Sequence, residues 1–314
     1  MKENFIICIN AVLPLFFMML AGFIARRAGL IREEDITRIN KIAFTVFLPC
    51  MLFKNIYGAD LSKVANIRML LMAGLGILGM FVFGWIGINL IVRDRSKHTA
   101  MIHCMGRTNF ALLGIPIAVN LLGEGGDVSP MAFLITVTSP VFNILVVVLF
   151  ELYRGGKVKA KDLLLEIVRN PLIIGATAGL LCVLLNIRIP TAVESTIRQF
   201  GNVATPLLVF VIGAFLKFDT FCKQLRNIVI ATVGRLFVIP AIALGICYAL
   251  GFTGIEMISA IGLFAAASGI VCFTMTAQMG GDAELAGDIV VMTNALVPFT
   301  MFLWLMLFKT LGVI

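Results

Sequence analysis

Ten long apolar stretches, separated by short polar breaks, constrain the fold of this chain more than any other feature. They cover residues 5–25, 39–56, 69–92, 98–122, 130–151, 171–187, 196–216, 227–250, 255–279 and 286–308. A helix needs about 20 mainly apolar residues to span the hydrocarbon core of a bilayer. No segment alternates apolar and polar residues over about ten positions, as the strands of a membrane β-barrel do. The pattern predicts an all-α integral membrane protein with ten transmembrane helices.

Composition supports the same class and excludes others. The 314 residues are 60% hydrophobic and 13% charged, and the mean hydropathy is +1.05. Soluble domains are about one quarter charged, so this chain has too few charged residues to cover the surface of a soluble domain. The composition therefore excludes a soluble enzyme, a disordered chain and a nucleic-acid module. The first stretch ends at Arg26-Arg27 rather than at a small-residue cleavage site, so we expect a retained first span.

The distribution of basic residues predicts the topology. Of the 25 lysines and arginines, 16 follow the first, third, fifth and seventh stretches, and seven lie on the opposite side. Loops rich in Lys and Arg stay in the cytoplasm. We therefore expect a multi-pass protein of the plasma (inner) membrane with both termini outside. The basic pI reflects this topology rather than a nucleic-acid surface.

The two halves of the chain repeat each other. Three pairs of residues are 157 positions apart, which is half of the length: Pro14 and Pro171, Pro49 and Pro206, and Phe53 and Phe210. This spacing predicts a first half at 1–157 and a second half at 158–314, with five helices each. Because five is odd, the second half must enter the membrane upside down. Inverted repeats of this kind are typical of secondary transporters.

Two of the predicted helices contain weak points. The fourth stretch contains Gly114-Ile115-Pro116, and the ninth contains Ser268-Gly269-Ile270 at the equivalent depth. A broken helix is tolerated in a membrane where it lines a cavity or is buried in protein. We expect helices 4 and 9 to be broken and to cross, with helix N-termini that favour a small carboxylate. The alternative is a packing kink in helix 4 and close packing of small residues in helix 9.

Polar and small residues near these breaks are the candidate substrate ligands. They are Asn109, Gly114, Ile115, Pro116, Asn120, Ser268, Gly269, Ile270, Thr293 and Asn294. Each polar one has an alternative role in a helix–helix hydrogen bond. Arg107 and Arg235 lie about nine residues inside their stretches, roughly 13 Å deep. Arginine at that depth faces a polar cavity or a partner. We expect Arg107 to line a vestibule for anions, with snorkelling to the interface as the alternative.

Motifs for enzymes, metals and cofactors are absent from the sequence. There is no HExxH, no GxSxG and no pair of aspartates at mid-membrane depth. The seven cysteines lack metal-ligand spacing, and Cys222 is the best candidate for an accessible thiol. Five acids are expected in loops or at helix ends: Glu124, Asp127, Asp282, Glu284 and Asp288. We expect no enzyme, no metal and no cofactor, and coupling to H+ or Na+ stays open.

Several segments together resemble the auxin efflux carrier family, which includes bacterial permeases assigned to malate and malonate. They are residues 12–22, 26–31, 39–53, 109–123 and 203–207. The resemblance implies an inverted-repeat fold like that of bile-acid transporters. It also implies a scaffold of helices 1, 2, 6 and 7, and a transport domain of helices 3–5 and 8–10. Pro49 and Pro206 would shape the scaffold face. Stretch 9 departs from the plant members because it lacks a proline.

These observations predict a secondary transporter that works by alternating access. The substrate would be a small organic anion, such as malate, malonate or an auxin-like acid, and the lipid bilayer would be the other partner. An alternative from another class is a membrane sensor or receptor that binds a small carboxylate without transporting it. A channel fits less well, because no filter or ring of charges is present. Whether the protein forms a homodimer is left open.

Overall fold

The computed structural model describes residues 2–57, 67–110, 114, 118, 129–154, 168–216 and 218–314. Within these ranges the chain folds into helices and contains no β-strand. In this part of the chain, five helices are long and apolar enough to cross a membrane. The prediction of an all-α protein with membrane-spanning helices is thereby confirmed.

The helices follow the predicted apolar stretches. In chain order the α-helices are α1 (Lys2–Arg27), α2 (Glu33–Ile42), α3 (Leu48–Tyr57), α4 (Ile67–Ile91), α5 (His98–Gly106), α7 (Ser129–Tyr153), α9 (Pro171–Leu184), α10 (Thr191–Phe215), α11 (Phe218–Val233), α12 (Ile239–Ala249), α13 (Gly254–Phe264), α14 (Val271–Gln278) and α15 (Ala283–Thr310). A short 3₁₀ helix, η3 (Arg95–Lys97), precedes α5.

Two π-helical turns join consecutive helices into continuous rods. The turn η1 (Ala43–Phe47) links α2 to α3, and η4 (Gly234–Val238) links α11 to α12. Each turn is followed within two residues by a proline, Pro49 or Pro240. A proline has no backbone N–H and clashes with the preceding turn, so a locally wider helix accommodates it without breaking the rod.

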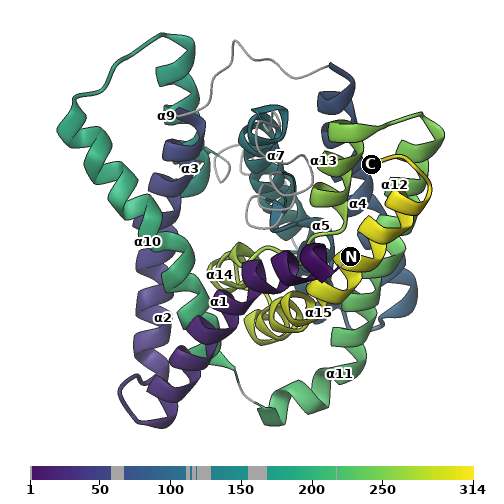
Figure 1. Ribbon diagram of the computed structural model, residues 1–314. Helices are drawn as coiled ribbons and strands as arrows, with labels where there is room; N and C mark the ends of the chain where they lie inside the picture. The colour runs from purple at the N-terminus through teal and green to yellow at the C-terminus, as the bar shows by residue number, and fades with distance from the viewer. Residues whose placement is uncertain are drawn as a thin grey trace.

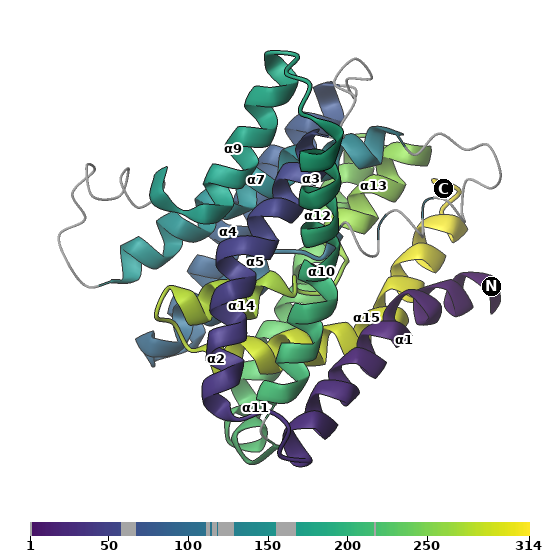
Figure 2. The same ribbon diagram turned by 90° about the vertical axis from the view of Figure 1, so that its left-hand side faces the viewer.

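The helices form two groups that lie side by side (Figure 1). In the first group α1 runs along α10, and α3 packs against both α9 and α10. In the second group α4 contacts α5 and α7, α12 contacts α13, and α15 contacts α11 and α14. Helix α1 also contacts α15 and so connects the groups. The two chain ends lie near each other in both views (Figures 1 and 2).

Glycines allow the helices of the first group to approach each other closely. A Cβ added at Gly22 of α1 would overlap the Phe210 carbonyl oxygen of α10, and one at Gly213 would overlap the Met19 carbonyl oxygen. A Cβ at Gly179 of α9 would lie 3.0 Å from the Phe53 carbonyl oxygen of α3. Without a hydrophobic drive between helices in lipid, close backbone contact of this kind is what holds membrane helices together.

We predict that alanine lowers the thermal stability at one helical glycine and does not lower it at another. Gly213→Ala should lower the Tm in detergent by about 2 °C or more, because overpacking against backbone costs about 1–3 kcal/mol. Gly245→Ala in α12 is the matched control, since an added Cβ there meets no atom within 4 Å. Helix propensity alone should make the control neutral or slightly stabilising. Equal Tm values for the two variants would contradict the close contact.

Candidate functional site

Two helices are interrupted and cross each other in the second group. Helix α5 ends at Gly106, and Arg107 is extended. Helix α13 ends at Phe264, and α14 begins at Val271. The two interruptions pair as an isolated antiparallel bridge between Thr108 and Ser268. The Asn109 N–H donates to the Ala267 carbonyl at 2.9 Å, and the Gly269 N–H donates to the Arg107 carbonyl at 3.1 Å.

The interruption of the second helix lies where the sequence predicted it, at Ser268-Gly269. The interruption of the first helix lies at residues 107–109, earlier than the predicted Gly114-Ile115-Pro116. Gly114 is itself helical, and Ile115 and Pro116 lie outside the described residues. The reason is that an extended segment in a membrane needs partners for its backbone groups, and residues 107–109 find them on the crossing chain.

Arg235 holds the ends of both interrupted helices. Its side chain is fully buried, at 0% exposure. Nε donates to the Ala266 carbonyl at 2.9 Å, Nη1 to the Met105 carbonyl at 3.1 Å, and Nη2 to the Leu263 carbonyl at 3.3 Å. These carbonyls belong to the C-terminal ends of α5 and α13, where helices leave acceptors unpaired and carry partial negative charge. Arg235 therefore compensates two helix ends at once.

Arg107 extends from the same crossing in a different environment. Arg107 is 6% exposed, and its Nη1 donates a hydrogen bond to Asn143 Oδ1 at 2.6 Å. Its guanidinium carbon lies 5.8 Å from the centroid of the Phe142 ring. No ion pair joins Arg107 to a carboxylate among the described residues. Arg107 is among the residues that line a polar cavity, and its expected role in a vestibule for anions stays a prediction.

A polar cavity of about 290 Å³ lies between the two groups of helices. One wall comes from α3 and α10, and the other from α7 and the crossing. The polar residues that line it are Lys54, Asn55, Arg107, Thr108, Asn109, Thr138, Ser139, Asn202 and Thr205. No Asp or Glu is among the lining residues in the part of the chain that the structure describes. The buried atoms Thr108 Oγ1 and Asn109 Nδ2 have no hydrogen-bond partner in the described structure.

Lys54 is a second cation of the cavity, and the sequence analysis did not identify it. Its Nζ donates to Asn202 Oδ1 at 2.6 Å, so it links α3 to α10. In the sequence Lys54 counts only as a charge near the end of a span. One feature of the sequence could have pointed to Lys54: it lies five residues after Pro49, which was expected to shape the scaffold face. Only the tertiary structure brings it opposite Arg107.

The structure divides the predicted ligands into two sets. Asn109, Gly269 and Ile270 line the cavity. Three others do not line it: Ser268, Thr293 and Asn294. Their polar groups form hydrogen bonds that stabilise the crossing. The Ser268 hydroxyl donates to the Cys104 carbonyl at 2.7 Å, and Asn294 Nδ2 donates to the Ser268 carbonyl at 3.2 Å.

The remaining candidates lie near the cavity or cannot be placed. Gly114 is buried against the Phe110 ring rather than in the cavity wall, and Asn120 lies outside the described residues. Pro49 and Pro206 belong to α3 and α10, close to the lining residues but not among them. Their expected effect on the scaffold face stays a prediction.

The other side chains considered in the sequence analysis, which are cysteines and acids, lie away from the cavity in the described structure. Within the described residues no three His, Cys, Asp or Glu side chains are grouped to hold a metal. Cys222 is exposed, as expected for an accessible thiol. Asp288 differs from its expected place at a helix end: it is five residues into α15, 2% exposed, with Oδ2 unpaired in the described structure. It does not line the cavity.

A membrane-spanning helical fold with a polar cavity at crossed, interrupted helices defines a membrane transport protein. Residues 7–305 match the family described as membrane transport protein. The chain belongs to this family, which is the auxin efflux carrier family that its sequence resembles. The family consists of transporters rather than enzymes.

Relatives agree with this assignment, and a solved structure has a similar fold. An uncharacterized transporter of Methanothermobacter thermautotrophicus is 24% identical over 300 residues, covering 94% of this chain and 96% of its own. The uncharacterized transporter YfdV of Escherichia coli K12 is 23% identical over 219 residues, covering 68% and 70%. The sodium proton antiporter MjNhaP1 of Methanocaldococcus jannaschii has a similar fold, with a TM-score of 0.59, 11% identity and 92% coverage of both chains.

We predict that the crossing depends on Arg235. Arg235→Met should destabilise the protein by about 3 kcal/mol or more, because three buried carbonyls lose a charged donor. Arg38→Met is the matched control: its side chain is 74% exposed and pairs with the exposed Glu34, so its effect should be within about 0.5 kcal/mol. Thermal unfolding in detergent measures both. A stable Arg235→Met variant would show that other groups satisfy the helix ends.

Proposed function

We propose that the protein is a secondary transporter of a small organic anion and that the substrate binds in the polar cavity between the helix groups. The observation that carries the proposal is the presence of two cations, Arg107 and Lys54, in a cavity whose described lining residues include no Asp or Glu. The cavity volume of about 290 Å³ suits a small solute. Malate, malonate and auxin-like acids belong to this class.

The energetics of Arg107 favour an anionic ligand. A cation at this depth is costly to remove from water unless an opposite charge or several hydrogen bonds compensate it. Asn143 supplies one short hydrogen bond, and the described residues supply no carboxylate. A substrate carboxylate placed against the guanidinium would complete its coordination through charge-assisted hydrogen bonds.

The crossing adds further groups that favour a carboxylate. Gly269, Ile270 and Val271 line the cavity where α14 begins. The first turn of a helix has N–H groups without intrahelical partners and carries partial positive charge. The free amide of Asn109 and the hydroxyl of Thr108 are further donors beside it. These groups, together with Arg107, form the wall against which the anion would bind.

The similarity to a sodium proton antiporter concerns the fold, and the cavity chemistry argues for a different cargo. A site for a hard cation is built from carboxylate, carbonyl and water oxygens. The lining contains Arg107 and Lys54 and, among the described residues, no Asp or Glu. An anion is therefore the better match, although the same crossed architecture would serve both kinds of transport.

For the architecture we propose ten spans in two inverted repeats, residues 1–157 and 158–314. Two contacts support this: Gly22 approaches the Phe210 carbonyl, and Gly179 approaches the Phe53 carbonyl. Each residue of the first contact is 157 positions from its counterpart in the second. The charge distribution supports a plasma-membrane location with both termini outside.

For the mechanism we propose that the first helix group is the scaffold and the second is the transport domain. Lys54 and Asn202 belong to the scaffold, whereas Arg107 and Asn109 belong to the crossing. A bound anion would thus contact both bodies and be released as they move relative to each other. Because the cations lie on opposite walls, the anion would contact both bodies in this relative position and would lose the Lys54 contact when they move apart.

We predict a selective loss of transport when the cavity changes charge. In proteoliposomes, Asn109→Asp and Lys54→Gln should each lower uptake of labelled malate, lactate or indole acetate by about tenfold or more, since each removes or opposes a charge-assisted contact. Lys309→Gln is the control, because Lys309 is exposed at the end of α15. Its uptake should match the wild type.

Exchange of internal for external substrate separates transport from binding alone. A transporter should show accelerated counter-flow of the active substrate, whereas a sensor would bind it without exchange. Wild-type uptake of every active substrate in both cavity variants would place the site elsewhere. Uptake of sodium or rubidium in place of the carboxylates would replace the anion proposal with a cation one.

A further inference from the structure

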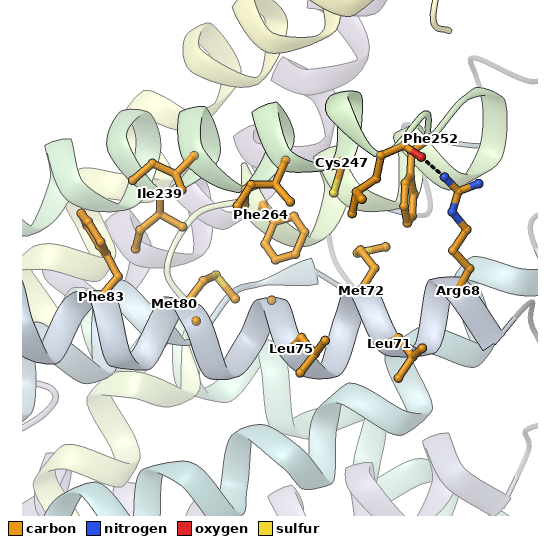
Figure 3. Close-up of a pocket in the computed structure, with 16 residues that line it drawn as sticks. Arg68, Leu71, Met72, Leu75, Met80, Phe83, Ile239, Cys247, Phe252 and Phe264 are labelled. Atoms are coloured by element: carbon orange, nitrogen blue, oxygen red, sulfur yellow. Dashed lines mark hydrogen bonds between the residues drawn. The ribbon is translucent and has the colours of Figure 1, made fainter.

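A second and larger cavity lies on the outer side of the second helix group. It is a slot of about 460 Å³ between α4 and α12, with Phe264 of α13 at its floor (Figure 3). Of the sixteen residues that line it, Arg68 is the one with a charged side chain. Arg68 lies at one end of the slot, and Phe83 lies toward the other end (Figure 3). The candidate substrate site shares no residue with this slot.

The walls of the slot belong to the surface that faces lipid. Leu71 and Leu75 of α4 are 55% and 67% exposed, and Ile246 of α12 is 55% exposed. In a membrane protein, such apolar side chains on long apolar helices contact acyl chains rather than water. Water would find almost no polar partner in the slot. The space is therefore continuous with the hydrocarbon of the bilayer.

The length of the slot matches one leaflet. Arg68 and Phe83 are fifteen residues apart on α4, which corresponds to about 22 Å at about 1.5 Å per residue. Half of a bilayer, including its headgroups, is about 20–22 Å thick. The slot thus runs from the headgroup region, where Arg68 lies near the start of α4, to about the middle of the membrane.

We propose that the slot binds one acyl chain of a bilayer phospholipid, with the headgroup at the Arg68 end. Arg68 pairs with Glu256 at 3.5 Å and lies over the Phe252 ring at 4.4 Å. It also donates a hydrogen bond to the Leu250 carbonyl (Figure 3). These contacts fix the guanidinium at the mouth, and 43% of its side chain remains exposed toward the headgroups.

The bound chain would contact the residues that support the crossing. Phe264 is the last residue of α13 before the interruption. Met80 also lines the slot, and its sulfur accepts a hydrogen bond from Arg235 Nη1 at 3.2 Å. A lipid chain at the inner end of the slot therefore packs against both the end of α13 and the residue that holds Arg235. This gives bilayer lipid a direct contact with the crossed helices.

Gly79 provides a variant that fills the slot. It lines the slot, and a Cβ added there meets no atom within 4 Å, so Gly79→Phe would place a ring in the space of the lipid chain. Gly74 on the same helix is also open around its Cβ but does not line the slot. Gly74→Phe is therefore the matched control for helix propensity and added apolar surface.

The test is native mass spectrometry of the full-length protein purified in mild detergent with added phosphatidylethanolamine. Wild type and Gly74→Phe should retain one phospholipid, and Gly79→Phe should lose about tenfold or more of this occupancy, since several buried methylenes are displaced. Thermal unfolding gives a second measurement. Phospholipids with sixteen-carbon chains should raise the Tm of wild type more than those with twelve-carbon chains, whereas Gly79→Phe should show no dependence on chain length.

Three results would overturn the proposal. Equal phospholipid occupancy in the wild type and Gly79→Phe would place the lipid elsewhere. Retention of a free fatty acid in place of a phospholipid would mean that the slot takes a different ligand. A wild-type dimer that Gly79→Phe dissociates, with no lipid bound to either, would mean that a second copy of the chain covers the slot.

Discussion

The fold depends on satisfying the backbone of two interrupted helices inside a membrane, where no water is available to do so. Residues 107–109 and 267–269 pair with each other through a short antiparallel bridge, and Arg235 donates to carbonyls at the ends of both α5 and α13. Unsatisfied backbone groups in hydrocarbon cost several kcal/mol each. Neither interruption would be stable without the other, so the second helix group has to be assembled as a unit.

The two deep arginines show how the same residue type acquires different roles. Arg235 is satisfied by main-chain carbonyls and is therefore complete without a ligand. Arg107 has one short hydrogen bond to Asn143 and a place in the cavity lining. Its Nη1 also donates to the Met275 sulfur at 3.4 Å, and Asn109 and the start of α14 line the same cavity. Because of this difference in hydrogen bonding, we assign a structural role at the helix ends to Arg235 and the proposed anion site to Arg107.

Much of the organisation follows from local sequence patterns, whereas the details of the site do not. Apolar length predicted the helices, and Ser268-Gly269 predicted the second interruption, because small residues weaken a helix locally. The first interruption in the described residues lies earlier than the predicted Gly114-Ile115-Pro116, because the extended segment at 107–109 is decided by hydrogen bonds to residues about 160 positions away. Ile115 and Pro116 themselves lie outside the described residues. Three predicted ligands have a different role for the same reason, because long-range contacts decide their environment: Ser268, Thr293 and Asn294. Their polar groups form hydrogen bonds within the crossing instead of lining the cavity.

The sequence by itself determined that the chain is a helical membrane protein of the membrane transport family and that its deep polar residues gather near two weak points. Those properties depend on composition, local periodicity and motifs. Only the tertiary structure decided that Lys54 lies across a cavity from Arg107, that Arg235 joins two helix ends, and that an apolar slot of about 460 Å³ separates α4 from α12. These features depend on contacts between residues far apart in the chain, which neither hydropathy nor spacing specifies.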